Sequence, residues 1–182
     1  MTNPLLLAIS EFLKYKNLAE KAFEQLTDEQ FFRSPDNGTS NSIAMIVKHI
    51  AGNLRSRWRD FLTTDGEKPD RYRDTEFELT DDDTRESLMK RWDDGWEFLF
   101  DTLDSLTEED LNRTITIRGE EHTVMQAIMR QLAHYPSHVG QIMYIARMLL
   151  GNDWKTLSIA KGKSKEFEEA VRTKQKTMKD IS

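Results

Sequence analysis

Two of the chain's four histidines, His134 and His138, stand four residues apart, a spacing that places both imidazoles on one face of a helix. Their Cβ atoms would then lie about 6 Å apart, so both rings could reach one ion. A third histidine, His49, lies in another helical segment. At about 100° per residue, all three rings fall on the flank of their helix's apolar stripe. Helical bundles build metal sites between neighbouring helices. We therefore predict a divalent-metal site of His49, His134 and His138. The alternative is that these rings are partly buried and hydrogen-bonded to backbone or to Asn53.

The chain contains no cysteine, which excludes disulfides, thiolate zinc sites, iron–sulfur clusters and a cysteine nucleophile. Three neutral imidazoles bind a divalent ion at about 2.0–2.1 Å and leave a coordination position open for water or substrate. With imidazole as the available ligand, Zn²⁺ and Ni²⁺ are the natural candidates.

Two polar residues near the histidines in sequence could orient the ligands. Asn53 comes one helical turn after His49, and Gln141 comes three residues after His138. Each could equally be a solvated helix residue. No carboxylate lies one turn from a ligand as the glutamate of an HExxH motif does, and this disfavours a peptidase-like hydrolase.

Two further residues near the predicted site have less direct roles. Pro136 lies between His134 and His138 and has no N–H to donate to the preceding turn, so we expect a kink or splayed histidines there. His122 precedes the helix of the pair, and we expect it on the surface.

Composition limits the classes of protein that need to be considered. The chain has 182 residues, of which 37% are hydrophobic and 9% aromatic, with a formal charge of −6. This length suits one domain with a substantial core, and the aromatic content argues against disorder. The acidity disfavours nucleic-acid binding, and no segment approaches the roughly 20 apolar residues of a membrane span. We read no signal peptide at the N-terminus, so we expect a cytoplasmic protein.

Four segments show helical periodicity of apolar residues and predict an all-α four-helix bundle. Asn3 and Pro4 suit an N-cap and a first helical position. We expect one domain over residues 1–182, with the bundle in residues 3–150 and a loop and short helix in residues 151–182. A short hairpin or extended excursion should precede the last long helix. The four stripes run over Leu5–Leu26, Ile43–Phe61, Leu88–Leu106 and Val124–Leu149.

Charge is distributed unevenly along the chain. Residues 151–182 carry a net charge of +3, whereas residues 1–150 carry −9. This basic tail could contact an anionic ligand, or it could be a solvated helix beside an acidic body. The tryptophans Trp58, Trp92 and Trp96 fall on apolar stripes, and we expect them to pack in the core.

Three stretches of the chain resemble the DinB-like (YfiT-like) superfamily, in a subgroup known as a domain of unknown function. They are NSIAMIVKH at residues 41–49, HYPSHVGQI at residues 134–142 and WKTLSIAKGKS at residues 154–164. Ala160 stands where this subgroup would have proline. The resemblance implies an up-down-down-up bundle, often a homodimer. It also implies a divalent metal held by His49, His134 and His138.

The resemblance and the residues together leave three functions open. Some DinB-like relatives transfer a low-molecular-weight thiol onto an electrophilic small molecule, and a metal ion suits this because it can generate the thiolate near neutral pH. The same ion could instead activate water for hydrolysis. The third possibility is a non-enzymatic bundle in which the histidines stabilise the fold or an interface.

Overall fold

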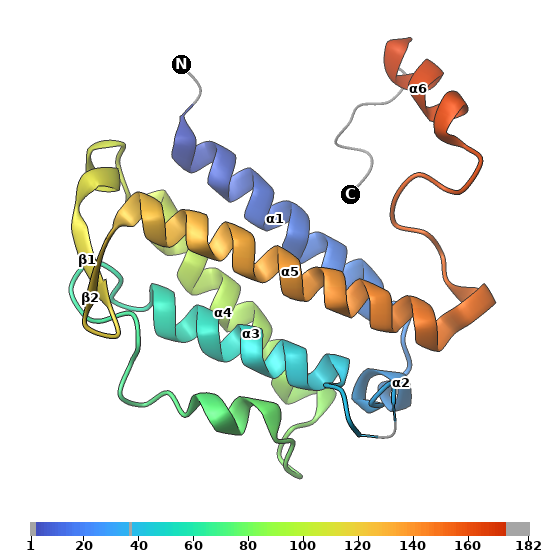
Figure 1. The fold of residues 1–182 in the computed structure, drawn as a ribbon, viewed down its shortest axis with the longest axis horizontal. Helices are drawn as coiled ribbons and strands as arrows, with labels where there is room; N and C mark the ends of the chain where they lie inside the picture. Colours follow the sequence, from blue (N-terminus) through green and yellow to red (C-terminus); the bar gives the residue numbers. More distant parts are fainter. Residues whose placement is uncertain (1–2, 37, 174–182) are drawn as a thin grey trace.

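Four long helices carry the fold in the computed structural model, which describes residues 3–36 and 38–173 (Figure 1). Each helix is preceded by an N-cap residue whose side chain accepts a hydrogen bond from a backbone N–H group of the first turn. The predicted cap Asn3, followed by Pro4, is one of these four residues. The helices are α1 (Pro4–Phe23), α3 (Ile43–Trp58), α4 (Arg85–Ser105) and α5 (Val124–Leu150).

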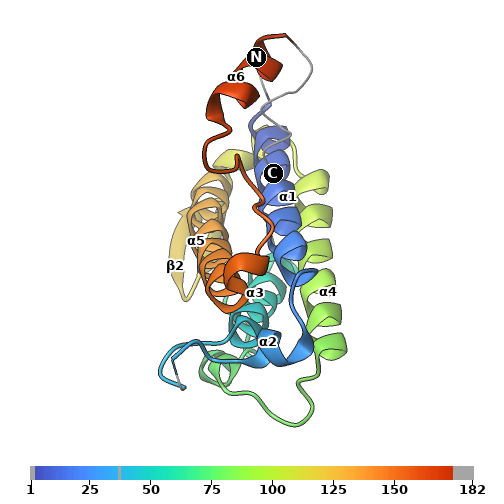
Figure 2. The same cartoon turned by 90° about the vertical axis from the view of Figure 1, so that its right-hand side faces the viewer.

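The four helices form an up-down-down-up bundle, as predicted. Figures 1 and 2 show α1 and α5 running in one direction and α3 and α4 running in the opposite direction. α1 packs mainly on α5 and α3 packs mainly on α4, with α3 also touching α5. This last contact brings the segment of His49 beside the segment of His134 and His138.

Shorter elements connect the long helices. The predicted excursion before α5 is an antiparallel hairpin of β1 (Thr114–Ile117) and β2 (Glu120–Thr123), in which Thr114 pairs with Thr123. The predicted C-terminal helix is α6 (Ser164–Arg172), which has no buried residue and stands away from the bundle in Figure 2. The other short elements are α2 (Asp28–Phe32) and the 3-10 turns η1 (Arg73–Phe77), η2 (Glu109–Asn112) and η3 (Gly151–Asp153).

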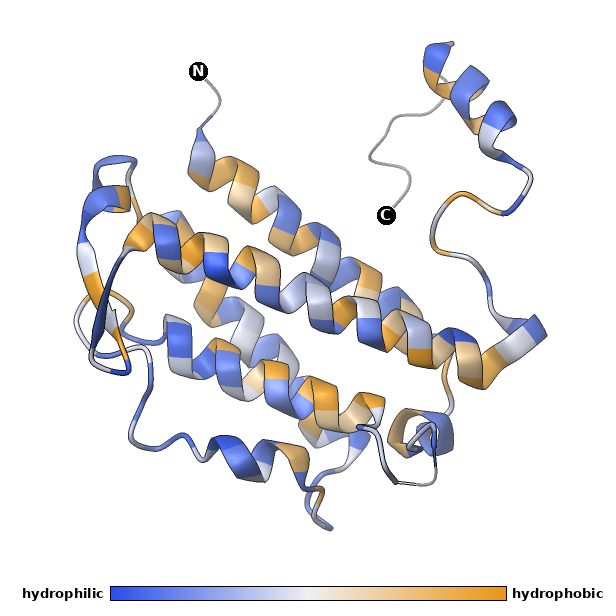
Figure 3. Cartoon of the chain, viewed as in Figure 1, coloured by the Kyte–Doolittle hydropathy of each residue, from blue (hydrophilic) through white to orange (hydrophobic). Residues whose placement is uncertain are grey.

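An aromatic cluster fills the centre of the bundle. Trp96 meets Phe12 and Tyr135 at ring-centroid distances of 6.3 and 5.6 Å, and Trp92 lies 5.5 Å from Trp96. With Trp58, all are almost completely buried, which confirms the expected core role of the tryptophans. Apolar residues recur along the long helices in Figure 3, whereas η1 and α6 are mainly hydrophilic. No helix among the described residues has the length and hydropathy needed to cross a bilayer.

The long connection between α3 and α4, residues 59–84, follows from the topology. Because these two helices are parallel, the chain must travel back along the bundle before α4 can begin, and η1 packs against α3 on the way (Figure 1). Gly52 on α3 makes room for this segment, since a Cβ at that position would overlap Oε1 of Glu76. The connection therefore places Glu76 against the helix that carries His49.

The helix α5 continues without a break through Pro136. The kink expected at this proline does not interrupt the helix, and the histidines on either side of it keep their one-turn spacing. A single rigid element thus carries both His134 and His138.

Candidate metal centre

Three histidine rings from two helices converge on one point. One ring nitrogen from each of His49, His134 and His138 lies within 4.8 Å of the others. The Nε2 atoms of His134 and His138 are 3.1 Å apart, and the His49 ring centroid lies 4.9 Å from that of His138. His49 is 4% exposed, while the other two are partly buried. The structure therefore brings together the three residues that the sequence predicts as ligands.

Each ring is held on its other side by a side-chain oxygen. The Nδ1 atoms of His134 and His138 lie 3.1 and 3.0 Å from Oε1 of Gln131 and Gln141, and Nδ1 of His49 lies 2.8 Å from a carboxylate oxygen of Glu76. Amide and carboxylate oxygens only accept hydrogen bonds, so each Nδ1–H donates. In a neutral ring held in this way, the Nε2 lone pair is free to bind a cation.

With Nδ1 protonated, the ring nitrogens that face one another are unprotonated and suit a cation. The Nε2 atoms of His134 and His138 present lone pairs to each other at 3.1 Å, which is unfavourable unless a positive charge lies between them. Two nitrogens at about 2.0–2.1 Å from one tetrahedral ion stand roughly 3.3 Å apart, close to this separation. The residues therefore fit a divalent transition ion.

Burial favours the neutral form of the His134 and His138 rings. It lowers the pKa of His134 to about 4, assisted by the positive charge that His138 and His49 would carry when protonated. Burial also lowers the pKa of His138. Because a metal competes with protons for imidazole nitrogen, both rings are ready to bind a cation at neutral pH.

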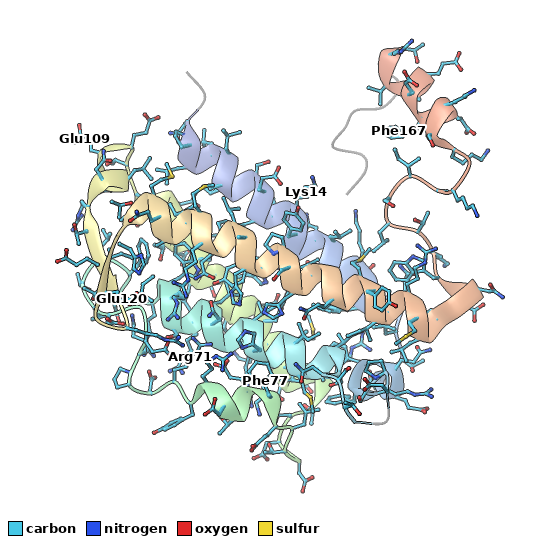
Figure 4. The ribbon with its side chains drawn as sticks, in the orientation of Figure 1. Lys14, Arg71, Phe77, Glu109, Glu120 and Phe167 are labelled. Carbon is cyan, nitrogen blue, oxygen red and sulfur yellow. The ribbon has the colours of Figure 1, made fainter. Side chains whose placement is uncertain are left out.

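Glu76 is the centre of a buried charge network on η1. Its carboxylate binds His49 and accepts hydrogen bonds from Nε and Nη2 of Arg71 at 2.8 and 2.9 Å. Burial raises the pKa of Glu76, but the bonds from His49 and Arg71 outweigh it and leave that pKa below its usual value. Phe77 stacks on the His49 ring at 4.8 Å between centroids. Figure 4 shows Arg71 and Phe77 on this segment beside α3.

The other residues singled out in the sequence lie in different surroundings. Gln141 contacts a predicted ligand, His138, as described above. Asn53 instead accepts a hydrogen bond from the Tyr135 hydroxyl at 3.0 Å, and that hydroxyl accepts one from Trp58 Nε1 at 3.1 Å. This chain of bonds satisfies polar groups within the core, and it directs the Asn53 amide oxygen to Tyr135.

His122 lies on β2 and takes no part in the histidine cluster. Its side chain is 22% exposed, so it is partly buried where we expected a surface position. Its Nε2 lies 4.0 Å from the Glu120 carboxylate.

Two of the residues that hold the rings, Glu76 and Gln131, were not predicted from the sequence. Gln131 lies three residues before His134, just as Gln141 lies three residues after His138. The same helical spacing could therefore have identified Gln131 as a neighbour of the histidine pair. Glu76 lies 27 residues after His49 in a segment without helical periodicity, and no local signal connects the two.

A groove of about 630 Å³ lies between α5 and the segment that leads into α3, and it reaches the histidines through Gln141, which contacts His138. Ser137 and Gln141, which flank His138 in sequence, form part of its wall together with Ile46, one turn before His49. Among the described residues, no charged side chain lines this groove. Its remaining wall is formed by Pro35, Thr39, Ser40, Asn41, Gly140, Tyr144, Ile145 and Met148.

Comparison with known proteins gives one family and one similar fold. The family model described as "Protein of unknown function (DUF1572)" matches residues 2–163. A crystal structure of "the conserved protein of locus from Enterococcus faecalis" is similar, with a TM-score of 0.63 and 14% sequence identity over 84% of this chain and 100% of that one. At that identity the likeness concerns the fold alone. No curated protein matches the chain.

Proposed function

The chain belongs to the DUF1572 family, and from that premise we propose that it is a DinB-like, metal-dependent enzyme that transfers a low-molecular-weight thiol onto an electrophilic small molecule. Its cofactor is one divalent ion, Zn²⁺ or Ni²⁺, held by His49, His134 and His138. The observation that carries the proposal is the convergence of three imidazoles whose Nδ1 atoms all contact a side-chain oxygen elsewhere.

The residues present suit such a reaction. An ion bound by three imidazoles keeps a coordination position open and, when bound, lowers the pKa of a thiol there so that the thiolate forms near neutral pH. Glu76, Gln131 and Gln141 fix the ring orientations, so little reorganisation is needed before reaction. The uncharged groove beside His138 offers a neutral electrophile a place close to the ligands.

One contact favours thiol transfer over hydrolysis. Hydrolysis by a metal-bound water usually needs a general base near the ion. Glu76, the carboxylate that contacts the His49 ring, already bonds to both His49 and Arg71, and its lowered pKa makes it a weak base. A thiol that loses its proton on binding the ion needs no such base.

Metal analysis of untagged protein and a conjugation assay test this proposal. We expect one Zn²⁺ or Ni²⁺ per chain, a higher melting temperature with the ion, and conjugation of 1-chloro-2,4-dinitrobenzene to a cellular thiol such as glutathione, bacillithiol or mycothiol. His49→Ala should abolish metal binding and conjugation, whereas His122→Ala should change neither. Sedimentation should show the homodimer that the DinB-like resemblance implies.

The same experiments separate the alternatives. Substrate turnover without any thiol would replace transfer with hydrolysis. Protein that carries no stoichiometric metal and gains no stability from Zn²⁺ or Ni²⁺ would leave a non-enzymatic bundle, and the proposal would be wrong.

A further inference from the structure

A second cavity, of about 560 Å³, lies between α3, the connection of residues 59–84 and α4. None of the three histidines lines it, but Glu76 and its hydrogen-bond partner Arg71 do. Its volume falls within the usual range for small-molecule sites. The cavity is therefore a separate place where a ligand could bind.

The wall of this cavity is strongly cationic, although the chain as a whole carries −6. Three carboxylates line it, from Asp70, Glu76 and Asp94. Against these stand twice as many basic side chains, so the wall has a formal excess of three positive charges. The basic residues are Lys48, Arg55, Arg59, Lys68, Arg71 and Arg91.

Ion pairing with carboxylates outside the wall lowers this excess without cancelling it, because single carboxylates are shared between two cations. Asp70 pairs with both Arg55 and Arg59, at 2.8 and 2.7 Å. Asp83 pairs in the same way with Lys48 and Arg91, at 2.7 and 3.0 Å. Each shared carboxylate can neutralise only one unit of charge, so each pair of cations keeps about one unit.

Lys68 adds a buried charge without a counter-ion. This residue is 6% exposed, and its ammonium donates to the main-chain carbonyl of Asp65 at 2.6 Å. Among the described residues it forms no ion pair with a carboxylate. Burial lowers its pKa and the nearby Arg59 lowers it further, against the opposing effect of the Asp60 and Asp65 carboxylates. A buried ammonium with no directly paired carboxylate is costly, and an anion in the cavity would supply a direct partner.

We propose that this cavity binds a small molecule that carries at least two phosphate or carboxylate groups. Arginine forks bind such oxyanions in bidentate geometry, and four arginines line the wall. A single monovalent anion would leave most of the charge excess in place. None of the three predicted metal ligands contributes to the wall, and the two sites are linked through Glu76, which contacts His49.

Isothermal titration of the EDTA-dialysed full-length protein tests the proposal, with inorganic pyrophosphate and citrate as probes and acetate as the monovalent reference. Removing metal first prevents chelation by either probe from contributing heat. We expect saturable 1:1 binding of pyrophosphate or citrate that weakens steeply with added salt, and no saturation with acetate. Tighter binding of pyrophosphate would indicate a site for phosphate groups, and tighter binding of citrate would indicate a site for carboxylate groups.

Matched variants locate the binding. Lys68→Met and Arg55→Gln should each weaken binding at least tenfold. Arg113→Gln is the control, since Arg113 is as exposed as Arg55 and pairs with a single carboxylate, Asp110, outside the cavity. His138→Ala, which removes a proposed metal ligand, should bind the anion normally. Absence of saturable binding by both probes, or equal affinity in Lys68→Met and Arg113→Gln, would overturn the proposal.

Discussion

Replacing Glu76 with glutamine should weaken metal binding while leaving the three ligands in place. The carboxylate contacts Nδ1 of His49 at 2.8 Å and holds that ring in the tautomer with a free Nε2. Glutamine keeps the size of the side chain and one acceptor oxygen, but it loses the negative charge that makes the imidazole a stronger donor. Changes to such partners of metal ligands cost about 10–100-fold in affinity, or roughly 1.4–2.7 kcal/mol. A competitive Zn²⁺ titration against a chromophoric chelator measures this difference.

Glu67→Gln is the matched control for this experiment. Glu67 lies on the same connection and also pairs with Arg71, at 3.4 Å, but it does not contact any of the three histidines. Its substitution should disturb the arginine network and leave Zn²⁺ affinity within about threefold of the wild type. Equal affinity losses in the two variants, or none in Glu76→Gln, would refute the reasoning that Glu76 acts through His49.

A third variant moves the carboxylate without changing it. In Gly52→Ala the new Cβ would overlap Oε1 of Glu76, so the carboxylate must shift away from its present position. We expect Zn²⁺ affinity to fall in the same direction as in Glu76→Gln. Unchanged affinity in Gly52→Ala would mean that the exact position of the carboxylate does not matter.

Three further predictions concern stability and pH. Tyr135→Phe leaves its two buried hydrogen-bond partners unpaired and should lower the free energy of unfolding in urea by about 1–3 kcal/mol, with Zn²⁺ affinity unchanged. Gly95→Ala places a Cβ 3.0 Å from that of Leu54 and should destabilise the protein by about 1–3 kcal/mol, whereas Gly140→Ala meets no atom within 4 Å and should stabilise it by about 0.5–1 kcal/mol in the same assay. The pKa of His134, about 4 in the folded chain against an ordinary 6.5, means that the unfolded chain takes up this proton first, so the stability of the metal-free protein should fall between pH 6.5 and 4. Urea midpoints over that range should fall less in His134→Ala, and an equal fall would contradict the assignment.

The four long helices could be predicted from the sequence because their apolar stripes extend over many turns, and the predicted Asn3 cap marks where the first begins. The hairpin before α5 and the C-terminal helix α6 were also predicted, but two other short elements were not. The short helix α2 and the turn η1 each span five residues, which is too short for a 3.6-residue period to be visible. The second stripe continues to Phe61, but α3 ends at Trp58, and Asp60 adopts a positive φ of 50°. Phe61 is buried although it lies in the loop after α3, so its apolar side chain extended the helical pattern in the sequence beyond the end of the helix.

The same division holds for the candidate site. The pairing of His134 and His138 follows from their spacing on one helix. The angular position of His49 placed its ring on the flank of its own helix's apolar stripe, as it did for the other two rings. Asn53 was a reasonable candidate because it lies one turn from His49, yet its amide oxygen binds the Tyr135 hydroxyl instead. Spacing on a helix predicts which residues share a face, but not which of several neighbours a polar side chain chooses. Whether an ion occupies the site stays a prediction.

The origin of the ligands from two helices far apart in sequence has a kinetic consequence. In the sequence, α4 and the hairpin lie between the helix of His49 and that of His134. The three ligand nitrogens therefore meet only after α5 has packed against α3. A bound ion would then link α3 to α5, and its coordination bonds would have to break before these helices could separate. Interactions completed late in folding mainly slow unfolding and hardly change the folding rate. Metal loading would therefore lengthen the lifetime of the native chain, and with it its resistance to proteolysis, more than it would speed assembly of the bundle.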